Sequence, residues 1–424
     1  MLLAIPGLVI LIEFLIIKKT LRFFLLSPVY IYILFSIASL VTSLWYFYDY
    51  SPKFDLYHID EISEKYFLEV IAKYMWALIY FMFGVILYYE AAARKSKMIF
   101  NRSFTHTLFF DIKIDNKYTK YAVMLVLSVV GLYFLVYGNA ILIRKEYLPK
   151  VNREFTLIIK VLTFLSAAFL GLIYKKNKLK SLVLFFLLIT ISIGTGSRSV
   201  FLAVMVFVLI KFISGGNNLS NKISFALNVL LSFVFLSYLM HLRSLDSHGV
   251  IPYLKNLTEL KDFRESIFFN IYYSLVYGVY VTAQTIKKAT LDWHIVFTNL
   301  NPLPGRFTDW YRYADQMRLN IFAPYSLHGR VFRTGGLFTF FYFLTTGIVF
   351  ADLEKRIRRL LERNKRILAF MIVLLLALHI VYGFEYNMRS AVRYIYYAYF
   401  IIFTVYIFDD FKKWHVAKKT GNAT

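Results

Sequence analysis

A concentration of arginine sets one polar segment of this chain, residues 242–334, apart from the apolar sequence around it. Between Ala289 and Gly335 there is no lysine at all, although lysine is common elsewhere. The same interval holds five arginines, namely Arg306, Arg312, Arg318, Arg330 and Arg333. A planar guanidinium group donates two parallel hydrogen bonds to a phosphate or carboxylate, whereas lysine acts as a point charge. The choice of arginine therefore predicts anion recognition, although ion pairs with Asp309 and Asp315 would occupy one or two of the five.

His328 is the first candidate for acid–base chemistry, because it lies beside Arg330 and Arg333 just before an apolar segment. A histidine with a pKa near neutrality can donate a hydrogen bond to phosphate or act as a general base. The neighbouring guanidinium groups should keep its ring neutral. A surface histidine without a role is the alternative interpretation. Asp246 is the second candidate base, and an acidic segment (Asp49, Asp55, Asp60 and Glu61) is the third, although that segment is more typical of a solvated surface.

A glycine-containing turn, residues 194–199, is a further candidate anion site. Its serines can cap the helix that follows, and helix N-termini attract anions. With Arg198 such a turn could hold a phosphate. The alternative is a plain helical hairpin whose arginine extends to the lipid headgroups. Near the C-terminus, Glu385, Asn387 and Arg389 could close a site or could simply cap helix ends.

The composition places these residues in an integral membrane protein. Of the 424 residues, 59% are hydrophobic, far above the roughly 45–50% of soluble domains, and aromatic residues are abundant. Cysteine is absent, so disulfides, thiolate metal ligands and cysteine nucleophiles are excluded. The net charge of +24 lies mostly in short basic runs beside apolar segments. Such runs mark the cytoplasmic ends of membrane spans, and they do not indicate nucleic-acid binding.

Eleven apolar stretches are long enough to cross, or nearly cross, a hydrocarbon core of ~30 Å. They are residues 2–17, 27–48, 67–89, 121–143, 155–174, 181–193, 199–213, 223–241, 335–351, 367–383 and 391–408. Alternation of these spans puts the basic loops and the C-terminus in the cytoplasm and the N-terminus outside. We therefore predict an all-α fold of 11–12 transmembrane helices. It would form a single domain, residues 1–424, in which 242–334 is a large structured outer loop carrying amphipathic helices.

One more apolar segment, residues 266–286, is predicted to stay outside the membrane, because a crossing there would turn the basic run 355–359 outward. Phe269, Tyr273, Tyr277 and Tyr280 recur at helical spacing. We therefore expect a helix that lies in the outer membrane interface on one aromatic face. A twelfth span, paired with a miscounted hairpin in 181–213, is the alternative.

The arrangement of these features resembles the O-antigen polymerases called Wzy, and the related O-antigen ligases. Three features carry the resemblance: the Gly-Ser-Arg turn at 196–198, the outer-loop sequence Asn-Pro-Leu-Pro-Gly at 301–305, and the His-Gly pair at 328–329 before the next span. The spacing of Arg318 and Gly329 also matches a motif of some of these polymerases, although it is short enough to arise by chance.

The resemblance implies a glycosyltransferase of the GT-C type in the bacterial inner membrane, with its active site facing the periplasm. It would move a glycan from undecaprenyl diphosphate to the sugar end of another lipid-linked repeat unit. Its partners would be these lipid-linked oligosaccharides, membrane lipids and a chain-length regulator protein, and not nucleic acid. His328, Arg306, Arg330 and Asp246 would act in catalysis, and Arg198, Arg243, Arg312, Arg318, Arg333 and Arg389 would bind the diphosphate. We expect no cofactor and no metal, because the outer segments lack acidic or histidine sets with metal-ligand spacing.

Two rival functions remain open at the level of sequence. A transporter or flippase would carry ionisable residues within its spans and two repeated halves. The predicted spans hold few charges, mainly Glu13, Lys73 and Lys160, and no repeat is evident. An O-antigen ligase would share the fold, donor and arginines, and would differ in using a lipid A core as acceptor.

Overall fold

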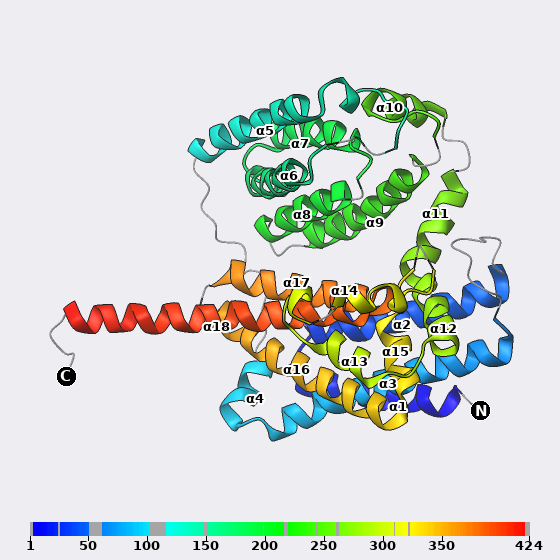
Figure 1. Cartoon of the computed structure of the whole chain (residues 1–424). Helices are drawn as coiled ribbons and strands as arrows, with labels where there is room; N and C mark the ends of the chain where they lie inside the picture. Colours follow the sequence, from blue (N-terminus) through cyan, green and yellow to red (C-terminus); the bar gives the residue numbers. More distant parts are fainter. Residues whose placement is uncertain are drawn as a thin grey trace. The chain divides into compact units, whose positions relative to one another are not determined.

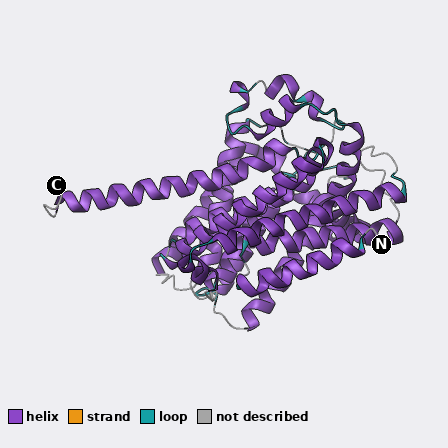
Figure 2. Ribbon diagram, turned by 90° about the horizontal axis from the view of Figure 1, so that it is seen from below, coloured by secondary structure: helices purple, strands orange, loops and turns teal. Residues whose placement is uncertain are grey.

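A computed structural model describes the chain over the following residues: 3–23, 26–50, 62–101, 116–147, 149, 151–197, 199–215, 219–242, 245–259, 263–308, 310–320, 323–363 and 365–419. Figure 2 shows that these residues are helical, joined by loops. Only two isolated β-bridges occur in the described residues. The all-α class predicted from the sequence is confirmed. The helices form two compact units, which we describe separately.

Unit 2 comprises residues 105–271. Its helices are α5 (Asn116–Tyr137), α6 (Arg153–Ile173), α7 (Lys178–Ile193), α8 (Ser199–Ser214), α9 (Leu219–His241), α10 (Val250–Glu259) and α11 (Phe263–Ile271). The core of the unit is aromatic and aliphatic, with Phe185 stacked on Phe207 at 3.9 Å between ring centroids. Each helix therefore buries an apolar face against its neighbours within the unit.

Unit 1 comprises residues 1–104 and 272–424. Its long helices are α1 (Ala4–Thr20), α2 (Pro28–Trp45), α3 (Glu64–Ala91), α16 (Gly336–Glu362), α17 (Arg366–Glu385) and α18 (Met388–Lys419). Shorter helices are α4 (Arg94–Asn101), the π-helix η5 (Tyr272–Val276), α12 (Tyr277–Lys288), α13 (Trp293–Leu300), α14 (Trp310–Tyr313) and α15 (Leu327–Thr334). Figure 1 labels the α-helices of this unit. One of the two places where the chain passes between the units, at residues 271 and 272, falls inside the predicted outer loop, and the single domain stays a prediction.

Seven helices of the described residues are long and apolar enough to cross a membrane, judged by length and composition. They run over Pro28–Asp49, Glu64–Ala91, Tyr118–Ile141, Glu154–Ile173, Leu219–Leu239, Gly336–Glu362 and Met388–Phe408. Two shorter apolar helices, Val200–Phe212 and Leu368–Phe384, accompany them. The membrane character inferred from composition is therefore supported, and the count of eleven spans stays a prediction.

Helices α3 and α16 pack at very short range because each presents a glycine to the other. A Cβ atom on Gly84 would lie 2.2 Å from the carbonyl oxygen of Leu344, and one on Gly347 would lie 2.0 Å from that of Phe81. Both separations are far inside van der Waals contact, so no larger residue fits without moving a backbone. Small residues at helix crossings are the usual means of close packing between membrane helices, where lipid supplies no hydrophobic drive.

The segment 266–286 differs from its prediction. It is divided into α11, which belongs to unit 2, and η5 with α12, which belong to unit 1. Residues 277–285 of α12 are buried on every side of the helix, in contact with α2, α3, α15 and α17. Tyr277 and Tyr280 therefore face protein, and the expected single aromatic face toward a membrane interface is absent from α12.

A fully buried ion pair joins the far end of α16 to three other segments of unit 1. Arg358 Nε donates to Glu354 Oε1 at 2.6 Å, and neither side chain is exposed. Arg358 also donates to the carbonyl oxygens of Phe100 (3.2 Å) and Arg22 (3.0 Å). Ser27 Oγ donates to the second oxygen of Glu354 at 2.7 Å. The pair thus holds the end of α1, the start of α2 and the end of α4 against α16.

Removal of Glu354 should strongly destabilise unit 1. Glu354→Ala leaves Arg358 buried without its counter-charge, which typically costs ~3–5 kcal/mol. Thermal or denaturant unfolding of the purified protein measures the change. Glu90→Ala is the matched control, because it breaks the exposed Lys97–Glu90 pair (2.9 Å), and such pairs contribute roughly 1 kcal/mol or less. Equal effects of the two substitutions would contradict the structural role of the buried pair.

Candidate functional site

The part of the predicted outer loop that belongs to unit 1, residues 272–334, is held there by a chain of buried hydroxyl groups. Ser326 caps α15 by accepting a hydrogen bond from the Gly329 N–H at 3.0 Å. Its hydroxyl is also 2.7 Å from that of Thr282 in α12, which is in turn 2.7 Å from the hydroxyl of Tyr74 in α3. Because each hydroxyl both donates and accepts, this chain satisfies all three groups away from water. It fixes the start of α15 against α12 and α3.

Gly329 allows α12 and α15 to approach closely. A Cβ atom at this position would lie 2.4 Å from Cβ of Thr285. In the His-Gly pair noted in the sequence, glycine is therefore required because a larger residue would collide with α12. The result is that α15 lies with most of its length inside the unit, and residues 327–332 are all buried.

His328 lies deep among aromatic rings. Its side chain is 3% exposed, with the rings of Phe384 and Tyr74 at 4.6 and 5.0 Å. Its Nδ1 is 2.7 Å from the carbonyl oxygen of Gly383, so Nδ1 carries the proton and donates it to α17. Burial lowers the pKa of His328 to about 3. The ring is neutral as expected, but burial is the cause and the neighbouring guanidinium groups are not.

This environment makes His328 an unfavourable general base. A base works best when its pKa lies near the working pH, and an enclosed ring of such low basicity accepts a proton poorly. The hydrogen bond to Gly383 instead ties α15 to the end of α17. The structure therefore favours a positioning role for His328 over the catalytic role that its neighbours in sequence suggested.

Arg330, one helical turn from the start of α15, is a buried cation that forms no salt bridge with a described carboxylate, although the charge of Asp292 acts on it. It is 4% exposed, and its Nη1 donates to the carbonyl oxygen of Thr290 at 3.0 Å. Its guanidinium lies over the ring of Tyr325 at 4.9 Å, and its buried Nη2 has no hydrogen-bond partner. Burial lowers the pKa of Arg330. Arg333, by contrast, is exposed and donates through Nε to the carbonyl oxygen of Ala289 at 3.1 Å.

Arg389, at the start of α18, is a second buried cation of the same kind. It is 2% exposed and donates to the carbonyl oxygens of Thr298 (2.8 Å) and Leu303 (2.5 Å). Its guanidinium lies over the ring of Trp310 at 4.9 Å, and its buried Nε has no partner. Asn387 caps the first turn of α18 by accepting from the Ser390 N–H at 2.9 Å, which fits the helix-capping alternative for this residue. The side chain of Glu385 lies outside the described residues.

Arg330 and Arg389 both contact the segment that contains α13: Arg330 binds Thr290 before the helix starts, and Arg389 binds Thr298 in its last turn and Leu303 beyond its end. Neither forms a salt bridge with any described carboxylate, and each keeps one buried nitrogen without a hydrogen-bond partner. A buried charge in this state is costly unless an anion completes its surroundings. Helices α15 and α18, which carry the two cations, are in contact with each other. The candidate anion site consists of α13, α15 and the start of α18.

The remaining arginines of the segment lie on its surface. Arg306, Arg312 and Arg318 are exposed and form no salt bridge with a described residue. The guanidinium of Arg306 lies 4.7 Å from the ring of Phe307, and that of Arg312 lies 5.8 Å from Tyr313. The ion pair expected with Asp315 is absent, and Asp309 lies outside the described residues. Unpaired surface cations raise the local concentration of an anionic ligand before it binds.

A hollow of about 150 Å³ opens between α3 and the junction of α15 with α16. It is lined by Lys73, Trp76, Tyr80, Phe332, Gly336 and Thr339. Lys73 is exposed and has no salt bridge among the described residues, and the lining next to it is largely aromatic. One cation beside apolar rings suits a ligand that joins a charged group to a hydrocarbon chain. The hollow borders the helix that carries Arg330.

The remaining predicted residues belong to unit 2. Asp246 is exposed, whereas Arg198 and Arg243 lie outside the described residues. The resemblance assigns Arg198 and the arginines of the loop to the same diphosphate, and this assignment stays a prediction. The turn at 194–197 is held by Arg144, whose guanidinium donates to the carbonyl oxygen of Gly194, and by Tyr147, whose hydroxyl donates to that of Gly196 at 2.5 Å.

Sequence reasoning missed the polar cluster around this turn. The backbones of Arg144 and His248 pair in both directions, at 2.7 and 2.8 Å, and His248 Nδ1 is 3.0 Å from the Tyr253 hydroxyl. Arg144 follows an apolar segment directly, so its sequence context indicated only a residue at a membrane boundary. Two loop segments about a hundred residues apart in the sequence pair here, and nothing in the local sequence of either segment indicates that pairing. Arg144 therefore serves the turn as a structural clamp.

In the described part of the chain, no three His, Asp or Glu side chains lie together as a metal site would require. Comparison of the chain with protein families, curated proteins and solved structures found no match to any of them.

Gly329→Ala should disrupt the site by forcing α15 away from α12. Overpacking of this kind typically costs ~1–3 kcal/mol. Gly131→Ala is the matched control, because a Cβ there meets nothing within 4 Å, and alanine in a helix is favoured over glycine by roughly 1 kcal/mol. Unfolding of the two variants in detergent measures the difference. A Gly329→Ala protein as stable as Gly131→Ala would show that the close approach is unnecessary.

The buried histidine also predicts a pH dependence of stability. The pKa of His328 is lower in the folded state, about 3, than the ordinary value near 6.5, so the unfolded chain binds more protons between these values. His328 should therefore lower the free energy of unfolding by about 1.4 kcal/mol for each unit of acidification in that window. In His328→Asn an amide replaces the donor to Gly383 and does not titrate. The variant should show a smaller loss between pH 6.5 and pH 4, and an unchanged slope would contradict this account.

Proposed function

We propose that the protein is a glycosyltransferase that moves a glycan from a polyprenyl diphosphate carrier to the sugar end of another lipid-linked repeat unit, as an O-antigen polymerase does. The observation that carries the proposal is the pair Arg330 and Arg389. Both are buried, neither has a described carboxylate partner, and each retains an unpartnered N–H. A diphosphate supplies the oxygens and the negative charge that such groups lack.

The chemistry of the reaction fits this arrangement. The bond between the sugar carbon and the diphosphate oxygen breaks, and its electron pair leaves with the diphosphate. The acceptor hydroxyl forms the new bond to that carbon and releases its proton. Negative charge therefore develops on the diphosphate, and fixed cations in a site with little water stabilise it most effectively. Arg330 and Arg389 are our assignment for this role.

The surroundings support a carrier that is both charged and apolar. The exposed cations Arg306, Arg312 and Arg318 attract the diphosphate, and the hollow beside Lys73 offers aromatic walls for the first part of a lipid chain. Seven helices able to cross a membrane suit a substrate that arrives from the bilayer. His328 contributes by holding α15 against α17, which places Arg330.

The test is transfer activity of the purified protein on a short-chain lipid-diphosphate repeat unit, followed by gel analysis. A ladder of products is expected. The proposal fails if the wild-type protein gives no product with a competent substrate, and transfer confined to a lipid A core acceptor would indicate a ligase.

Arginine-to-lysine substitution tests the role of the two buried cations. Arg330→Lys and Arg389→Lys keep the charge but lose the planar fork, and loss of one charge-assisted hydrogen bond costs ~1.5–3 kcal/mol. Each should therefore lower the rate of ladder formation by about tenfold or more. Arg22→Lys is the matched control on an exposed arginine, and should leave the rate unchanged. Size-exclusion profiles verify that the variants remain folded, and full activity of both buried-site variants would remove the assignment.

A further inference from the structure

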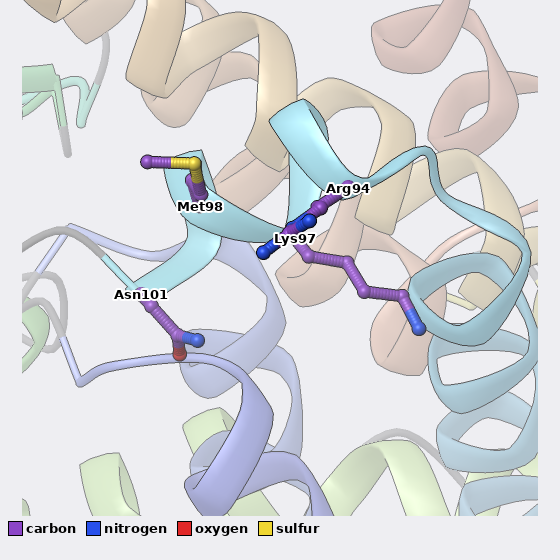
Figure 3. Close-up of a pocket in the computed structure, with 4 residues that line it drawn as sticks. All are labelled: Arg94, Lys97, Met98 and Asn101. Atoms are coloured by element: carbon purple, nitrogen blue, oxygen red, sulfur yellow. The ribbon is translucent and has the colours of Figure 1, made fainter.

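A second basic site lies on α4, far along the chain from the arginine-rich segment. Arg94, Lys97, Met98 and Asn101 line an open hollow of about 350 Å³. Figure 3 shows that all four side chains come from this one short helix. They occupy positions i, i+3, i+4 and i+7, which is a single helix face. The hollow therefore presents two cations, one amide and one thioether side by side.

The opposite face of α4 is fastened to unit 1. Ser96, Ile99 and Phe100 are buried, and the ring of Phe100 packs against that of Tyr89 at 4.4 Å. The carbonyl oxygen of Phe100 accepts from Arg358 and from the Arg22 N–H at 3.1 Å. Because its inner face is held in this way, α4 presents its basic face outward in one fixed orientation.

The position of α4 in the chain identifies the surroundings of this face. Helix α3 is long and apolar enough to cross a membrane and ends at Ala91, and α4 begins at Arg94. Two residues separate them, so α4 starts at the level where lipid headgroups lie. A short helix with cations beside an exposed apolar residue is typical of a membrane-surface helix. Met98, which is 61% exposed, is that apolar residue.

We propose that this hollow binds the headgroup phosphate of an anionic phospholipid, with Met98 in contact with the adjoining acyl chains. Arg94 and Lys97 supply the charge, and the Asn101 amide supplies a further hydrogen-bond donor. Lys97 also pairs with Glu90 at 2.9 Å, but the two side chains are 43% and 61% exposed, and such a solvated pair is weak enough for a phosphate to replace it. The site is separate from the proposed transferase chemistry and does not depend on it.

Native mass spectrometry of the full chain in a neutral detergent tests the site, with phosphatidylglycerol as the probe and phosphatidylcholine as the neutral reference. Wild-type protein should bind phosphatidylglycerol more tightly. The double variant Arg94→Gln/Lys97→Gln should weaken this binding roughly thirtyfold, since each basic residue near an anionic lipid contributes about fivefold. Lys95→Gln is the matched control, because Lys95 is an exposed cation of the same helix that does not line the hollow.

Three outcomes would overturn the proposal. Unchanged binding by the double variant would show that the hollow is not the site. An equal loss in Lys95→Gln would show a diffuse effect of charge without a defined site. Glycerol phosphate that displaces the lipid at matched concentration would show a site for soluble phosphate in which the membrane plays no part. The substituted side chains are exposed or partly exposed, so loss of folding is not expected, and the unfolding temperature of each variant verifies this.

Discussion

The buried pair of Arg358 and Glu354 is the interaction on which the arrangement of unit 1 depends most. A guanidinium group with no exposure must satisfy its donors within the protein, and Arg358 does so with a carboxylate and two backbone carbonyls. Those carbonyls belong to segments that are remote in sequence from α16. The free-energy cost of burying the charge is thus offset only when α1, α2, α4 and α16 pack together. The ion pair therefore favours this one arrangement of the four helices over others.

Helix α16 connects the buried ion pair to the other contacts that position the helices of unit 1. At its far end it places α4, whose basic face the same pair orients. Along its length, Gly347 and the facing Gly84 bring it against α3. At its start it continues from α15, which is held in turn by Ser326, Thr282 and Tyr74. The candidate anion site therefore rests on helices that are positioned by close packing and buried hydrogen bonds, as a preorganised site requires.

Buried arginines have two different roles in this unit. Arg358 has its carboxylate and is structural. Arg330 and Arg389 have carbonyl oxygens and aromatic faces but no described carboxylate, and each retains an unsatisfied N–H. The residue type is the same in all three cases, so the distinction lies in what surrounds the guanidinium group. The prediction from sequence grouped the loop arginines together, whereas the structure separates two buried cations from the exposed Arg306, Arg312 and Arg318.

The sequence by itself determined the membrane class, the helical fold and most helix positions, because long apolar runs bounded by basic residues are local signals that need no partner. It also identified the arginine-rich segment, since residue choice is visible without structure. Only the tertiary structure decided that α12 is enclosed by protein, that His328 is buried and weakly basic, and that Arg330 and Arg389 are buried without a salt bridge to a described carboxylate. Those properties depend on contacts between residues far apart in the chain, which set burial, hydrogen bonding and basicity.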